Sequence, residues 1–169
     1  MIGSGSAPPD LVLGGDPKEL TTLSLLDGGT ASGTTVNSGG MLFISGGSET
    51  GGHVLGGGSL TISGGTGAIS AEAGAKVTFL GPGGELITDQ PDFAAVISGF
   101  GAGDLIDMAD FKYSNGTQAS FKNGTLALTH GNEHTQLSLA GNYTASNFGL
   151  SSDGSGGTLI AFRQPPGQV

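Results

Sequence analysis

Pairs of glycine divide the first half of this chain into units in which apolar and polar residues alternate. Gly28-Gly29, Gly46-Gly47 and Gly64-Gly65 follow one another at a constant interval of about 18 residues, which indicates a repeat architecture. Two units carry equivalent apolar residues at the same distance from their glycines, in Met41–Ile44 and Ser59–Ile62. Alternation over such a short segment is typical of a β-strand. The pattern therefore predicts short strands joined by glycine corners.

The alternation assigns the side chains of each unit to two faces. Leu42 and Ile44 point to one face, and the residues beside them point to the other. A single unit is too short to bury its own apolar pair. Stacked units would place Leu42 over Leu60 and Ile44 over Ile62 at a strand spacing of about 4.8 Å, and each buried side chain would contribute roughly 1.5–3 kcal/mol. The sequence thus predicts an all-β fold, a right-handed parallel β-helix or β-solenoid, in preference to a meander of antiparallel hairpins.

Less regular copies flank these units. Val77 and Phe79 occupy the leucine and isoleucine positions of a third copy, and an earlier copy ends at Leu26-Asp27-Gly28-Gly29. Nearer the N-terminus, Asp16-Pro17-Lys18-Glu19 fits either a short helical turn over the first coil or a plain turn. We assign residues 1–90 to the glycine-rich solenoid.

The pattern changes after Asp89-Gln90-Pro91-Asp92, which we take as the hinge to a region at residues 91–169 that is continuous with the solenoid. Asn123-Gly124 lies between alternating segments and is a strong hairpin signal, so this region combines hairpins with the last solenoid coils. Strands are expected at 119–122, 125–129, 135–139 and 158–162. Large apolar residues suit a cap that blocks the open solenoid edge. They are Phe93, Phe100, Phe111, Phe121, Phe148 and Phe162.

Composition narrows the class of protein. Glycine supplies 35 of the 169 residues, but there is no Gly-X-Y period and 36% of residues are hydrophobic, which excludes a collagen-like or disordered chain. Five basic residues against 14 acidic ones give a formal charge of −9, which excludes nucleic acid and anionic membrane surfaces as partners. There is no cysteine for disulfides or thiolate metal sites. No apolar run reaches the ~20 residues that membrane insertion requires, and no signal peptide is visible at the start.

Several segments resemble exported bacterial proteins. Gly33–Gly47 resembles the short repeat of AIDA-type autotransporter adhesin passengers. Val96–Phe100 with Gly103–Met108 resembles the segment that trails the β-rolls of type I secreted proteins, serralysin-like proteases among them. Leu139–Thr144 and Ser152–Ile160 are similar to the tail that accompanies this segment in large secreted adhesins. The order of these segments is more specific than any one of them.

The resemblance implies a secreted protein, extracellular or at the bacterial cell surface, with a role in adhesion or biofilm formation. It implies cell-surface or matrix glycans or proteins as partners, and in some members O-heptosylation of repeat serine and threonine. One feature departs from the β-roll pattern. The nearest match to its calcium-binding Gly-Gly-x-Gly-x-Asp repeat is Gly64–Ile69, which has isoleucine where aspartate belongs. Open solenoid edges would further allow self-association.

Candidate metal ligands lie at the hinge and in the second region. Asp104, Asp107 and Asp110, with Asp89 and Asp92, are the best candidates for a Ca²⁺ site, because hard cations bind several oxygen ligands. The spacing of the first three alternates between the two faces of a strand, which disfavours a joint catalytic site for a pair of these carboxylates. No other cofactor is expected.

The histidines give no catalytic pattern. His130 and His134 are separated by a segment that begins Gly-Asn, which favours a turn over the helix that a His-x-x-x-His metal site needs. His53 lies at a repeat corner, and Glu49 and Glu72 are isolated in the sequence. We expect solvated turn residues. The repeat hydroxyls Thr34, Ser45, Thr61 and Ser63 are expected to point outward and are candidates for glycan attachment.

Three functional hypotheses follow. The first is a non-catalytic structural or adhesive module of a secreted bacterial protein. The second is a C-terminal accessory of a larger exported enzyme, which carries the secretion signal. The third is a β-helical carbohydrate-active enzyme, for which the three aspartates would be the site. We favour the first, because the repeat has no recurring pair of carboxylates on adjacent coils.

Overall fold

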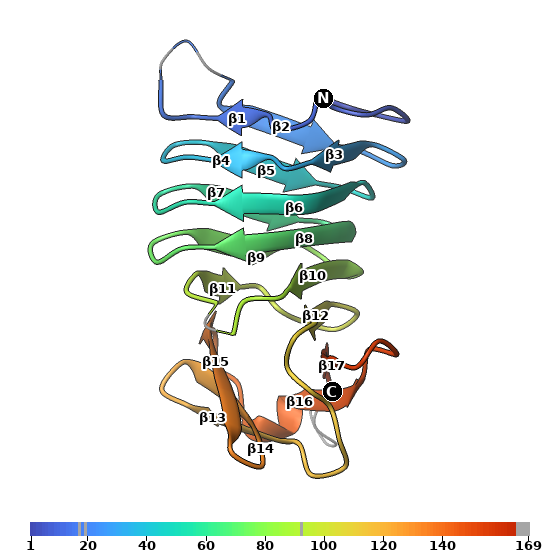
Figure 1. The fold of residues 1–169 in the computed structure, drawn as a ribbon, viewed down its shortest axis with the longest axis vertical. Coiled ribbons are helices and arrows are strands. Elements are labelled where there is room, and N and C mark those ends of the chain that lie inside the picture. The colour runs from blue at the N-terminus through green and yellow to red at the C-terminus, as the bar shows by residue number, and fades with distance from the viewer. Residues whose placement is uncertain (17, 19, 92, 165–169) are drawn as a thin grey trace.

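The computed structural model describes residues 1–16, 18, 20–91 and 93–164. Its strands form two sheets around one hydrophobic core (Figure 1). Sheet A contains β2 (Thr22–Leu25), β5 (Met41–Ile44), β7 (Ser59–Ile62), β9 (Lys76–Phe79), β11 (Val96–Ser98), β13 (Gln118–Lys122), β14 (Thr125–His130) and β15 (Glu133–Ala140). Sheet B contains β1 (Val12–Leu13), β3 (Thr30–Ser32), β4 (Thr35–Val36), β6 (Ser48–Val54), β8 (Gly65–Ala71), β10 (Gly84–Thr88), β12 (Leu105–Met108), β16 (Phe148–Ser152) and β17 (Thr158–Phe162). A 3-10 turn, η1 (Ala145–Asn147), precedes β16.

Each coil contributes one strand to sheet A and then one to sheet B, except that β3 and β4 together form the sheet B part of the first complete coil. The strands of successive coils are parallel, in the order β2-β5-β7-β9-β11 along sheet A and β4-β6-β8-β10-β12 along sheet B. In Figure 1 the coils stack along the long axis, and the nearer strands run from right to left as the chain descends. This coil is right-handed, as nearly all parallel crossover connections are. The predicted β-solenoid is confirmed.

The equivalence of the repeat units is also confirmed. Leu42 pairs with Leu60 and Ile44 pairs with Ile62 in the register of β5 and β7. These residues belong to two inward columns in which every side chain is at most 4% exposed. One column is Leu23, Leu42, Leu60, Val77 and Ile97, and the other is Leu25, Ile44, Ile62 and Phe79. The stack therefore buries apolar side chains that no single coil could shield.

The interval between equivalent residues varies around the predicted value. It is as predicted from Leu42 to Leu60, one residue shorter from Leu60 to Val77, and longer from Val77 to Ile97. A change of one residue within a strand would turn its inward side chains outward, so the corners absorb most of the difference. Within β6, a bulge at Gly51 accommodates one further residue. The parallel coils continue past residue 90 to the end of β12 at Met108.

Glycine is required at the corner that opens β8. Gly65 has a φ of +81°, which side chains other than hydrogen rarely allow. A Cβ atom at this position would also clash with the carbonyl oxygen of Gly47 in the preceding coil. Both the turn and the close stacking of coils therefore depend on the missing side chain.

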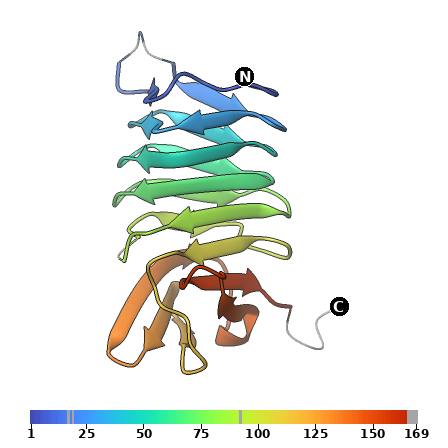
Figure 2. The same cartoon turned by 45° about the vertical axis from the view of Figure 1, so that its right-hand side comes forward.

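Both ends of the stack are covered. Ile2 and Ser6 form parallel bridges with Leu25 and Thr30 of the first complete coil, and β1 pairs with β4. At the other end, β15 pairs with β11 and β17 pairs with β12, so the antiparallel cap continues both sheets (Figure 2). The predicted turn at 16–19 includes residues 17 and 19, which lie outside the described residues.

The cap forms from the predicted hairpin and an aromatic cluster. Asn123 and Gly124 both have positive φ and join the antiparallel β13 and β14, which confirms the predicted turn. Phe100 leaves the last coil and lies 5.6 Å from Phe79 and 6.3 Å from Phe148, measured between ring centroids. Aromatic packing thus joins the solenoid core to the cap.

Candidate functional site

Asp104 is a structural carboxylate in the turn before β12. It is 2% exposed, and its two oxygens accept hydrogen bonds from the backbone amides of Gly84, at 3.1 Å, and Gly101, at 3.0 Å. Burial raises the pKa of the Asp104 carboxyl, and these hydrogen bonds oppose the shift. The side chain holds two corners of adjacent coils together, and each of its oxygens accepts a hydrogen bond from a backbone amide.

Asp107 lies in β12, at the junction between the solenoid and the cap. Its neighbours in the register are Ile87 of β10 and Leu159 of β17. Its Oδ1 atom is buried and accepts no hydrogen bond from the described residues. Burial, followed by repulsion from Asp153 and Glu85, raises the pKa of Asp107 to about 6. The carboxylate is therefore costly to ionise in this position.

The three predicted aspartates do not converge. Asp104 is held in a buried turn, Asp107 lies on the strand, and Asp110 is exposed after the strand ends. Asp89 is exposed beyond β10, and Asp92 lies outside the described residues. Among the described residues, no three acidic or histidine side chains are grouped as ligands for one metal ion.

We expect Asp107→Asn to remove a pH-dependent loss of stability. Because the pKa is raised from 3.8 to about 6 on folding, the folded protein holds this proton more tightly than the unfolded chain does. The resulting stabilisation is complete at pH values below the pKa of Asp107 in the unfolded chain, and it is lost as the pH rises towards about 6. The variant should lack this step and should be more stable than the wild type above about pH 6.

Urea unfolding across this pH range measures the effect. Asp110→Asn is the matched control, because Asp110 is exposed and its replacement should leave the step in place. Burial also raises the pKa of Asp104 and Glu49, and both remain in each variant, so the difference between the two curves belongs to Asp107. A step that persists in Asp107→Asn would contradict the assignment.

We expected the Thr34 side chain to point outward, and this expectation was wrong. Thr34 is fully buried, because it is in phase with the inward Val36 two residues later. Its amide donates to Oε1 of Glu49 at 3.1 Å, and its hydroxyl donates to Oε2 at 2.7 Å. Burial raises the pKa of Glu49, and these hydrogen bonds oppose the shift. Sealed from solvent, the Thr34 hydroxyl is out of reach of a modifying enzyme in the folded protein. The other three hydroxyl candidates are partly exposed, and they are Ser45, Thr61 and Ser63.

A Ser–His–Glu row that the sequence analysis missed lies on the outer face of sheet B. His53 of β6 pairs with Ser70 of β8, and its Nδ1 forms a hydrogen bond with the Ser70 hydroxyl. Its Nε2 lies 3.5 Å from Oε1 of Glu72. The row has the order nucleophile, base and orienting carboxylate, on an open sheet face where His53 and Glu72 side chains are 40% and 54% exposed.

The other histidines lie at the hairpin of β14 and β15. His130 pairs with Glu133 and Thr129 pairs with His134 across this antiparallel turn. His130 Nδ1 lies 3.9 Å from Oε2 of Glu133. The predicted turn is confirmed, and the two imidazoles are not presented from one helical face.

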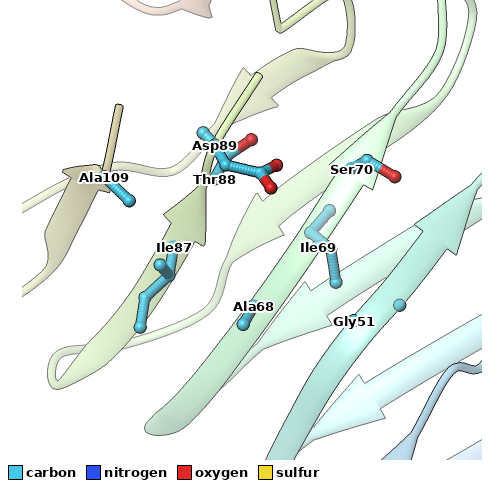
Figure 3. Close-up of a pocket in the computed structure, with 9 residues that line it drawn as sticks. Gly51, Ala68, Ile69, Ser70, Ile87, Thr88, Asp89 and Ala109 are labelled. Carbon is cyan, nitrogen blue, oxygen red and sulfur yellow. The ribbon is translucent and has the colours of Figure 1, made fainter. Parts of the chain in front are cut away.

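Two shallow hollows lie on the outer face of sheet B. One has a volume of about 450 Å³ and lies over β8 and β10, beside the bulge of β6 (Figure 3). Ala68 and Ile87 lie side by side in its floor, and Ser70 and Asp89 lie at one end (Figure 3). The other hollow has a volume of about 340 Å³ and is lined by hydroxyl groups of β3 and β6, together with the N-terminal segment. This face is the candidate functional surface.

Comparison of the chain with protein-family models, curated proteins and solved structures found no match. In the part of the chain that the structure describes, no helix has the length and apolar character needed to cross a membrane.

Proposed function

We propose that this chain is a non-catalytic structural and adhesive module of a secreted bacterial protein, and that it presents its outer sheet faces to cell-surface or matrix material. The observation that supports the proposal is the unbroken inward column from Leu25 through Ile44 and Ile62 to Phe79. Each coil extends the stack by about 4.8 Å and repeats the same outward positions. A stack of this kind is a stiff, extended platform, a form that solenoid proteins use for binding large partners.

The covered ends also support this role. The N-terminal bridges and the antiparallel cap occupy the strand edges that would otherwise recruit further strands. The sheet faces, in contrast, remain open over several coils. Binding through these faces is therefore the favoured mode of attachment.

Retention of the intact, labelled chain on layers of host cells, extracellular matrix and biofilm matrix tests the proposal. We expect retention on at least one of these surfaces, with no release of reducing sugar or free carboxylic acid. Ser70→Ala tests the catalytic alternative. Because the proposal gives the Ser–His–Glu row no catalytic role, neither the wild type nor this variant should turn over a polysaccharide or an ester. Failure to adhere to any surface would overturn the proposal, and so would turnover of a polysaccharide or ester that Ser70→Ala abolishes.

A further inference from the structure

Two rows of hydroxyl side chains cross the outer face of sheet B, one residue from each coil. Their members face outward and are in register between neighbouring strands. The longer row is Ser6, Thr30, Ser48 and Thr66, and the shorter row beside it is Ser32 and Thr50. Strand spacing sets the interval within a row at about 4.8 Å. The result is a regular, flat array of hydroxyl groups along the solenoid axis.

Three of the six hydroxyls of the array are preorganised by hydrogen bonds. Ser6 and Thr30 are linked by a hydrogen bond of 2.9 Å between their hydroxyls, and the Thr66 hydroxyl donates to Glu85 at 3.2 Å. Threonine is also restricted at χ1 by its branched Cβ. Little side-chain entropy remains to be lost when a ligand binds such groups.

Hydroxyl groups both donate and accept hydrogen bonds, so they match partners that carry hydroxyls in either role. The hollow of about 340 Å³ is lined by every member of this array except Thr66. The hollow of about 450 Å³ lies on the same face and has Ala68 and Ile87 in its floor. A sugar ring offers both kinds of surface, polar hydroxyls at its edge and apolar C–H groups on its faces. A chain of sugars would repeat these contacts from coil to coil.

The charges of the face select against anionic chains. None of the strands β3, β6, β8 and β10 contains lysine or arginine. The exposed and partly exposed charged groups on and beside them include the carboxylates of Glu72, Glu85 and Asp89, which would repel uronate, sulfate or phosphate groups. These charges exclude an anionic partner, and the hydroxyl rows favour a neutral chain that is rich in hydroxyl groups.

The outer face of sheet A is less uniform. Met41 and Val96 are 42% and 47% exposed there. Between them on the neighbouring strands lie Ser59, which pairs with Met41, and Lys76, which pairs with Ser59 and Val96. Its hydroxyls include the in-register series Thr61, Thr78 and Ser98. This face offers a control with similar hydroxyls in a different setting.

We infer that the outer face of sheet B binds a neutral polysaccharide, laid along the solenoid axis over the two hydroxyl rows and the adjoining hollows. The inference rests on the proposed adhesive function and names the surface and the ligand class.

Pull-down of the full chain with insoluble neutral polysaccharides tests it, using cellulose, chitin and β-mannan, with calcium polygalacturonate gel as the anionic comparison. We expect retention on at least one neutral polymer and none on the polygalacturonate. The triple variant Ser48→Ala/Thr50→Ala/Thr66→Ala should bind at least tenfold more weakly, which corresponds to about 1.4 kcal/mol. The control Thr61→Ala/Thr78→Ala/Ser98→Ala should bind as the wild type does. Thermal unfolding of both variants checks that the fold is kept.

Equal loss of binding in the two triple variants would overturn the inference, and so would retention on polygalacturonate alone. Retention of the chain on cells or on a protein matrix, with no binding to any polysaccharide, would also overturn it but would leave the proposed adhesive function intact. Failure to bind any surface at all would defeat both.

Discussion

Replacing Leu60 by alanine should lower the free energy of unfolding by about 2–5 kcal/mol. Leu60 is fully buried in the middle of its column, between Leu42 and Val77. The neighbouring strands are held at a fixed spacing by their backbone hydrogen bonds, so the site cannot collapse around the smaller side chain. The cost of the cavity therefore adds to the loss of buried apolar surface.

Leu80→Ala is the matched control, because Leu80 is 56% exposed at the corner after β9. Its replacement should change the stability by no more than about 0.5 kcal/mol. Urea unfolding of the two variants beside the wild type measures the difference. Equal stabilities for the two variants would show that the column does not hold the coils together.

Phe100→Ala should detach the cap from the solenoid and cost about 3–5 kcal/mol. The Phe100 ring is 2% exposed and lies against Phe79 of the last coils, and its centroid is 6.2 Å from that of Phe162 in the cap. The Tyr143 hydroxyl also donates to the Phe100 carbonyl at 2.8 Å. Loss of the ring leaves a cavity where the two parts of the core meet.

Limited proteolysis with mass spectrometry should show earlier cleavage in the cap than in the coils of Phe100→Ala, and urea unfolding should show the loss of stability. Phe43→Ala is the control, because Phe43 is partly exposed on the outer face of sheet A. It should leave the cleavage pattern of the wild type unchanged. Cleavage that begins in the coils of Phe100→Ala would contradict the role of this ring as the link to the cap.

Local sequence patterns predict some strands of the cap but not all of them. Thr158–Phe162 forms β17 with the bounds expected, and Asn123-Gly124 places the hairpin. Phe148–Ser152 was not predicted, since its alternation is weak and glycine and serine fill it. It becomes a strand because β17 offers it an antiparallel partner and the aromatic cluster buries Phe148.

The Ser–His–Glu row cannot be found from the repeat interval of the sequence. The interval between the glycine pairs, applied strictly, would set His53 beside Ala71. The bulge at Gly51 shortens this interval by one residue for the rest of β6, which brings His53 beside Ser70 instead. An insertion of one residue exchanges the faces of all that follows, and nothing local in the sequence specifies which residue is left unpaired.

The sequence by itself determined that the coils stack and which residues form the middle of the shared columns. Leu42 and Leu60 are equivalent in the chain, and stacking requires equivalent side chains at equivalent positions in successive coils. The tertiary structure alone decided the polar contacts. The pairing of Thr34 with Glu49 and the isolation of Asp107 between β10 and β17 depend on corner lengths, a bulge and the docking of the cap. The corner lengths, the bulge and the docking of the cap bring together residues that are not related by the repeat interval. Polar contacts depend on the positions of individual donor and acceptor atoms, which the period of the chain does not specify.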